Sequence, residues 1–195
     1  GTRTGVFVGV SSGEYLHSMI TRQCEMASYV GTGNSPSIIP NRISYHLNLR
    51  GPSMALDTAC SSSLVAMQLA CESLARGETE YALAGAVALT LHHGKWVYFS
   101  KAGMLAADGH CKTFDASANG YVPGEGVAAV LLKPLRAALR DRDTIHGVIR
   151  GIAVNQDGRT NGITAPSPRA QRELCQEVYE RFGIDPSTIS YVEAH

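Results

Sequence analysis

The chain has 195 residues, of which 44% are hydrophobic, and its 17 basic and 17 acidic residues cancel. This balance gives no sign of a nucleic-acid or anionic-membrane partner, and no apolar run approaches the length of a membrane span. The five cysteines show no zinc-site spacing, so we expect reduced thiols in a cytoplasmic protein without a metal.

Apolar runs and helical periodicity alternate along the chain. Buried strands are predicted for residues 4–10, 53–59, 81–91 and 127–132, and further sheet strands for residues 145–154 and 189–193. Helices are predicted for residues 14–29, 38–47, 61–76, 134–142 and 168–182, with loops at residues 31–36, 101–115 and 155–167. Alternation of this kind predicts an α/β fold with a largely buried sheet.

Cys60 stands where a predicted strand turns into a helix. The apolar face predicted for that helix comprises Leu64, Met67, Cys71 and Leu74. Free N–H groups and the dipole at a helix start favour a thiolate, and small neighbouring residues leave room for a substrate. Cys60 is therefore a candidate nucleophile.

Most free cysteines are buried and inert, so the structural interpretation has to be weighed for each of them. Cys71 falls on the predicted apolar helix face and is expected in the core, and Cys175 is expected to serve packing. Position alone distinguishes Cys60 from the other cysteines.

A second candidate nucleophile is Ser11, in the sequence Gly9-Val10-Ser11-Ser12-Gly13. This sequence matches the G-x-S-x-G elbow of serine hydrolases and follows a predicted strand, with His195 available as a base. The pattern is short, and a chain with 20 glycines matches it easily by chance.

His195 follows a predicted strand at residues 189–193, and α/β active sites usually lie at carboxyl ends of strands. A cysteine paired with a distant histidine is suited to acyl transfer. His92 and His93 are adjacent and would point to opposite sides of a strand, so a shared metal is not expected.

Several segments together resemble the ketosynthase domain of modular (type I) polyketide synthases, a β-ketoacyl synthase family. They occur in the family order and span the chain: Asn41-Arg42-Ile43-Ser44-Tyr45, Leu49-Arg50-Gly51-Pro52-Ser53, Asp57-Thr58-Ala59-Cys60-Ser61-Ser62-Ser63-Leu64, Lys112-Thr113-Phe114-Asp115, Gly120-Tyr121-Val122, Gly124-Glu125-Gly126, Val154-Asn155-Gln156-Asp157-Gly158, Thr160-Asn161-Gly162 and Tyr191-Val192-Glu193-Ala194-His195. Pro123 departs from the arginine that many relatives carry.

The resemblance implies a thiolase-like layered αβαβα fold with mixed five-stranded sheets. Residues 1–150 would form the N-terminal half, with the first family strand missing before Gly1, and residues 151–195 would begin a truncated C-terminal half. The family's second active-site histidine, its lysine and its oxyanion loop would follow His195, so we expect the isolated chain to be inactive.

The resemblance also implies the chemistry. Cys60 would accept an acyl chain from an acyl carrier protein and condense it with a decarboxylating malonyl-type extender, while His195 would help to hold the enolate. No cofactor or metal is implied, because the substrates are thioesters on the carrier's phosphopantetheine arm, and the family forms homodimers. Relatives with glutamine as the nucleophile only decarboxylate, so Cys60 favours condensation. A catalytically incomplete fragment and a serine hydrolase using Ser11 are the alternatives.

Overall fold

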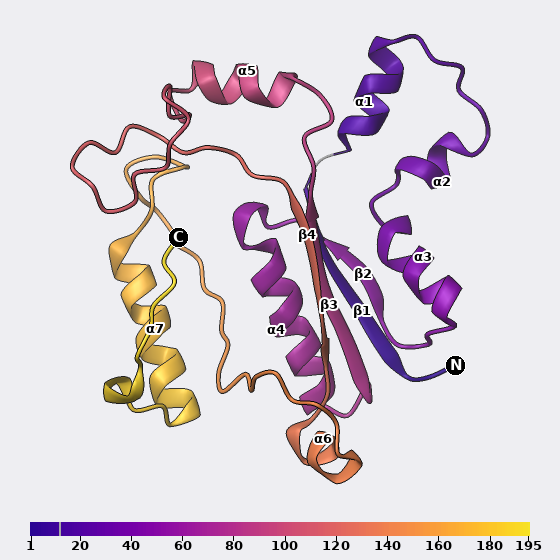
Figure 1. The fold of residues 1–195 in the computed structure, drawn as a ribbon, viewed down its shortest axis with the longest axis vertical. Coiled ribbons are helices and arrows are strands. Elements are labelled where there is room, and N and C mark those ends of the chain that lie inside the picture. The colour runs from indigo at the N-terminus through magenta and orange to yellow at the C-terminus, as the bar shows by residue number, and fades with distance from the viewer. Residues whose placement is uncertain (12) are drawn as a thin grey trace. The chain divides into compact units, whose positions relative to one another are not determined.

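The computed structural model describes residues 1–11 and 13–195 (Figure 1). It divides into two compact units, Gly1–Lys133 and Pro134–His195, and each is described by itself. The predicted domain division at residue 150 stays a prediction.

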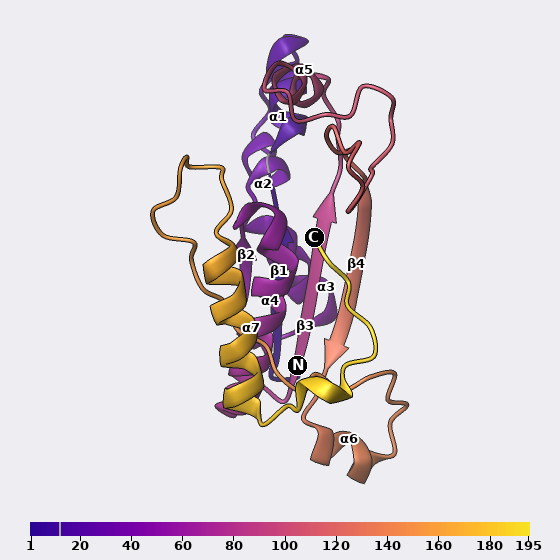
Figure 2. The same ribbon diagram turned by 90° about the vertical axis from the view of Figure 1, so that its left-hand side faces the viewer.

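The first unit contains a four-stranded sheet in the order β2-β1-β3-β4. Its strands are β1 (Thr4–Val10), β2 (Ser53–Leu56), β3 (Tyr81–Ala88) and β4 (Gly126–Leu132). β1 is parallel to both β2 and β3, whereas β3 and β4 run in opposite directions (Figure 2). The mixed α/β class is confirmed, and the four strands agree with the expected five-stranded sheet without its first strand.

Alternating residues of β1 serve two hydrophobic cores. Phe7 packs with Ala82 and Ala84 of β3 and with Ala66 and Ala70 of α4 (Ser62–Ala75). Val6, Val8 and Val10 pack instead with residues that include Ile43 of α3 (Ile38–Leu47). Successive side chains of a strand point to opposite faces. α4 and α3 therefore lie on opposite sides of the sheet (Figure 1).

Met67 and Leu74 of the predicted face of α4 pack against the core, but the residues that α4 buries fully are small ones that were not predicted. Ser62, Ala66, Ala70 and Ser73 are buried, whereas Leu64 is 59% exposed. Small residues spaced along one helix face let its backbone come close to the sheet.

Three further helices lie in the first unit. α1 (Glu14–Thr21) ends eight residues before the predicted end at residue 29, because Gln23 turns the chain with φ of 52°. α2 (Val30–Asn34) replaces most of a predicted loop, and α5 (Gly94–Lys101) was not predicted. Its sequence lacks an apolar face of helical period, which explains the omission.

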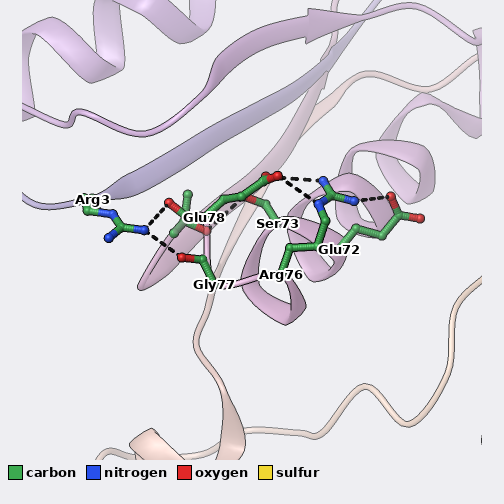
Figure 3. Close-up of polar contacts among 7 residues, drawn as sticks. Arg3, Glu72, Ser73, Arg76, Gly77 and Glu78 are labelled. Carbon is green, nitrogen blue, oxygen red and sulfur yellow. Dashed lines mark hydrogen bonds and ion pairs between the residues drawn. The ribbon is translucent and has the colours of Figure 1, made fainter.

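An arginine network joins the start of β1 to the end of α4 (Figure 3). Arg3 donates hydrogen bonds to the carbonyl oxygens of Gly77 (2.6 Å) and Glu78 (2.9 Å). Arg76 in turn pairs with Glu72 and Glu78. Gly77 lies in the left-handed region, with φ of 69°, so α4 stops where it was predicted to stop.

β4 is far more exposed than predicted. Val127 is 80% and Leu131 65% exposed, although an apolar run of this kind predicts burial on both faces. β4 is an edge strand of the sheet, and α4 packs mainly against β1 and β3. The apolar side chains of β4 are consequently exposed to solvent within this unit.

The second unit contains α6 (Leu135–Asp141), α7 (Pro168–Phe182) and a short 3-10 helix, Pro186–Thr188. α7 has the predicted bounds: the Ser167 side chain accepts a hydrogen bond from the Ala170 N–H, and Gly183 adopts a left-handed conformation at the C-terminus. Residues 145–154 and 189–193, predicted as strands, have no regular secondary structure.

Across residues 1–11 and 13–195, no helix combines the length and the apolar character needed to cross a bilayer.

Candidate active site

Cys60 lies in a short 3-10 helix, Ala59–Ser61, between β2 and α4. β1, β2 and β3 are parallel and in register at their carboxyl ends, because Gly9 pairs with both Leu56 and Ala86. The side chain of Cys60 is exposed. The structure therefore presents an accessible thiol at the carboxyl edge of the sheet, as predicted.

Hydrogen bonds on both sides of Cys60 hold its backbone. The buried Ser62 hydroxyl accepts from the Thr58 N–H (2.9 Å) and donates to the Ala59 carbonyl (2.7 Å). Asp57 accepts from the Ala59 N–H (3.0 Å), and the Ser61 hydroxyl donates to the Thr58 carbonyl (2.8 Å). None of these bonds uses the backbone N–H of Cys60.

Ala59 and Gly9 fix the position of this turn. Ala59 adopts φ of 55°, a left-handed conformation that is uncommon for a residue with a side chain. A Cβ built on Gly9 would lie 2.9 Å from Ser62 and 3.0 Å from the Ser63 nitrogen. The Gly9 of the G-x-S-x-G sequence thus permits close packing of β1 against the first turn of α4.

Tyr121 was not predicted as a site residue. The Tyr121 N–H donates to the Met104 carbonyl (2.9 Å), and the Tyr121 carbonyl accepts from the Ala106 N–H (3.0 Å). Partial burial raises the pKa of the Tyr121 phenol, and electrostatic interaction with Cys60 and Tyr98 raises it further. Tyr121 is therefore a neutral hydroxyl on the segment before β4. The adjoining Gly120 has φ of 143°, a conformation that glycine adopts more readily than other residues.

His195 lies in the second unit and is exposed, outside regular secondary structure. Its predicted place at the end of a strand is not observed, because residues 189–193 form none. Cys60 lies in the first unit, so the pairing of these two residues stays a prediction.

The serine-hydrolase interpretation finds little support around Ser11. An elbow needs a helix packed behind the nucleophile, but α1, which follows it, contains no buried residue. Ser11 is exposed after β1, and Ser12 lies outside the described residues.

The remaining cysteines and histidines divide by their surroundings. Cys71 is half-buried, and burial, followed by the charge of Glu72, raises the pKa of its thiol. Cys175 is exposed, contrary to its expected packing role.

The prediction that His92 and His93 point to opposite sides of a strand is wrong. Their ring centroids lie 4.3 Å apart in the turn after β3. Among residues 1–11 and 13–195, no group of three or more potential ligands is placed to hold a metal.

Residues 1–138 match the family described as "Beta-ketoacyl synthase, N-terminal domain", and residues 146–195 match "Beta-ketoacyl synthase, C-terminal domain".

Similar proteins include the highly reducing polyketide synthase dmxL2 of Cryptosporiopsis, which is 52% identical over the whole chain. Polyketide synthase PksL of Bacillus subtilis is 50% identical over 99% of the chain. The chain spans only 8% and 4% of these relatives, respectively.

Two solved structures have similar folds. The ketosynthase from module 6 of the bacillaene synthase of Bacillus subtilis is 47% identical, with a TM-score of 0.90 over 98% of this chain and 32% of that one. The oxazolomycin ketosynthase domain OzmH KS7 of Streptomyces albus is 43% identical, with a TM-score of 0.92 over 100% of this chain and 33% of that one.

Proposed function

The chain belongs to the β-ketoacyl synthase family, and from this we propose that Cys60 is the nucleophile of a polyketide chain-extending Claisen condensation. The observation that carries the proposal is the exposed thiol at the carboxyl edge of the sheet, on a turn braced by Ser62 and Asp57. The substrates are an acyl thioester and a malonyl-type thioester, delivered by an acyl carrier protein.

In the first half-reaction the acyl group moves from the carrier to the enzyme. The Cys60 sulfur attacks the thioester carbonyl, a new sulfur–carbon bond forms, and the bond to the carrier's sulfur breaks. The proton lost by the Cys60 thiol ends on the departing thiol, so charge and atoms balance. The backbone N–H of Cys60 is suited to stabilise the oxyanion, where one donor contributes about 3 kcal/mol.

In the second half-reaction the extender loses CO₂ and leaves an enolate on its thioester. The enolate carbon attacks the acyl carbonyl on Cys60, a carbon–carbon bond forms, and the sulfur leaves as a thiolate that takes up a proton. Hydrogen-bond donors lower the energy of the enolate. We assign one such donor to His195.

Cys60→Ala tests the nucleophile in the complete ketosynthase domain. Removing the sulfur should abolish both the acyl-enzyme, followed by mass spectrometry, and the condensed product. Substantial acyl-enzyme in the variant would refute the assignment. Fluorophosphonate labelling of Ser11 would instead support the hydrolase alternative.

His195→Ala separates the two half-reactions. If His195 holds the enolate, the variant should still be acylated on Cys60 and should release CO₂ from the extender far more slowly. Normal release of CO₂ combined with failed acylation would make His195 the base of the thiol.

Residues 1–195 expressed alone are expected to be inactive. Val127 and Leu131 leave apolar surface open on β4, and the chain spans about a third of the solved ketosynthases. We expect this polypeptide to bind hydrophobic dye and to give no condensation product. Condensation at an enzyme-like rate would refute this expectation.

A cytoplasmic location and a homodimeric complete domain belong to the same proposal. The free thiols of all five cysteines are compatible with a reducing compartment.

A further inference from the structure

Three histidine rings meet where α1 packs on the turn after β3. The ring centroids of His17, on α1, and His92 lie 4.4 Å apart with the rings edge to face, and those of His92 and His93 lie 4.3 Å apart. His92 is half-buried, whereas the other two are exposed. We call these three residues the histidine cluster. Histidine changes its charge close to neutral pH, so the cluster is a candidate pH sensor.

The ring of His92 is bound in its neutral form. Its Nδ1 accepts a hydrogen bond from the backbone N–H of Gly94, at 3.0 Å. A ring nitrogen that accepts a hydrogen bond carries no proton, so the proton of neutral His92 is on Nε2. The contact is close, because a Cβ built on Gly94 would lie 2.9 Å from Nδ1.

Protonation of His92 at Nδ1 would break the bond to Gly94. Gly94 is the first residue of α5, so the bond satisfies one of the N–H groups that a helix start leaves without a partner in the helix. The positive charge would also lie at the start of this helix, where the helix dipole opposes it. The structure therefore couples the charge of His92 to the start of α5.

A carboxylate joins the same turn to α1. Glu14, the first residue of α1, accepts from the N–H groups of Leu91 (2.7 Å) and His92 (3.1 Å) through one carboxylate oxygen. α1 buries none of its residues fully. Polar contacts with the turn and the packing of His17 on His92 therefore matter more for the position of α1 than they would for a helix with a buried face.

The surroundings of His92 disfavour its charged form. Burial is the main cause that lowers its pKa, and the other two rings of the cluster lower it further. Glu14 acts in the opposite direction, and Arg22, just beyond α1, lowers the pKa again. Glu125 also faces this turn, because its carboxylate accepts from the Thr90 N–H at 2.5 Å.

A lowered pKa makes the packing of α1 on the turn dependent on pH. If the turn opens, the pKa of His92 returns toward the ordinary histidine value of about 6.5, so the open form takes up a proton more readily than the closed form. The closed form is consequently most stable above this pH. It loses stability as the pH falls below it, until the lowered pKa of the closed form is passed.

We propose that the histidine cluster is a pH-sensitive latch between α1 and the start of α5: protonation of His92 breaks its bond to the Gly94 N–H, and repulsion among the charged rings separates α1 from the turn after β3. The latch is closed at neutral pH and opens in mildly acid solution. The proposal concerns the conformation of the first unit and is independent of the reaction assigned to Cys60.

Hydrogen–deuterium exchange in the complete ketosynthase domain tests the latch. Exchange is followed by mass spectrometry at about pH 7.5 and about pH 5.5, on either side of the ordinary histidine pKa, and is corrected for the intrinsic effect of pH on exchange. Peptides from α1 and from residues 91–97 should lose protection by about fivefold at the lower pH, the equilibrium change for one net hydrogen bond. Peptides from α4 should keep their protection.

His92→Asn separates the acceptor from the charge. The asparagine oxygen takes the place of Nδ1 and can accept the N–H two residues later, but it takes up no proton in this pH range. This variant should stay protected at both pH values. His92→Ala lacks the acceptor and should be poorly protected in residues 91–97 at both. His146→Asn, at an exposed histidine of the second unit, is the matched control and should behave like the parent.

Two results would overturn the latch. The first is equal protection of the parent at the two pH values. The second is a fall in His92→Asn as large as in the parent, because this variant retains Glu14 and the other two histidines and would show that the response does not come from His92. Loss of protection in α4 to the same extent would also contradict the proposal, since it indicates acid unfolding of the whole domain.

Discussion

The buried Ser62 hydroxyl braces the turn that carries Cys60. It is 5% exposed, and from the far side of Cys60 it bonds two consecutive backbone groups, the Thr58 N–H and the Ala59 carbonyl. Ser62→Ala leaves both backbone groups without this partner. We expect a loss of about 0.5–1.5 kcal/mol in the free energy of unfolding, the usual net effect of losing one hydrogen bond, because the Ala59 carbonyl keeps the Ser62 N–H as a donor.

The same substitution should slow acylation of Cys60, because the left-handed Ala59 loses its brace. Denaturant unfolding and acyl-enzyme formation measure the two effects. Ser63→Ala removes a neighbouring exposed hydroxyl and serves as the control. Equal effects of the two substitutions would contradict the role assigned to Ser62.

The half-buried Cys71 allows a prediction of pH dependence. Burial is the main cause that raises the pKa of its thiol, and Glu72 adds to it, so its thiolate forms only at higher pH than in an unperturbed cysteine. Labelling of Cys71 by iodoacetamide should therefore be slow at neutral pH and should rise in alkaline solution. Peptide mapping across a pH series checks this, with the exposed Cys175 as reference. Rapid labelling of Cys71 at neutral pH would contradict the prediction.

Cys60 and Tyr121 show why the sequence predicted one candidate site residue and missed another. Cys60 could be predicted because its place between strand and helix is local in sequence. Tyr121 could not, because its position depends on backbone bonds to Met104 and Ala106 in an irregular segment. No periodic pattern encodes contacts of that kind.

At the scale of elements, the site depends on the approach of α4 to β1. Gly9→Ala would place a Cβ 2.9 Å from Ser62, closer than real contacts allow, and the obstacle includes backbone atoms. The first turn of α4 must then move, and Cys60 with it. We expect a loss of about 1–3 kcal/mol in stability, typical of overpacking, together with slower acylation.

Gly31→Ala in α2 is a suitable control, because its Cβ would meet no described atom within 4 Å. Thermal unfolding and acylation rates of the two variants give the comparison. If Gly9→Ala behaves like Gly31→Ala, the close packing is not required.

Local patterns predicted elements well where packing partners were also local. β1, α3 and α7 have the predicted bounds, because apolar runs, a proline in the first turn and a terminal glycine act within a few residues. Residues 145–154 and 189–193 were wrongly predicted as strands. A strand needs a neighbour to pair with, and the second unit contains no sheet among its described residues.

At the scale of the whole molecule, the sheet has two edge strands with different properties. β2 has four residues, and its Met54 is 37% exposed, whereas β4 has seven residues and exposes most of its side chains. A free strand edge can pair with a second copy of itself about a two-fold axis. The family resemblance implies a homodimer in which the strand before Cys60 pairs with the same strand of the second protomer. We therefore expect β2 to form the dimer interface.

Met54→Lys should therefore disrupt the dimer of the complete ketosynthase domain. A lysine on β2 would meet its own copy across the two-fold axis, and repulsion between these charges together with their desolvation opposes association. Light scattering should show monomer, and condensation should fall with it, because the β2–α4 turn that carries Cys60 follows this strand directly. Val127→Lys, on the opposite edge of the sheet, should leave the dimer mass unchanged. An intact dimer in Met54→Lys, or a fully active monomer, would show that assembly does not use β2.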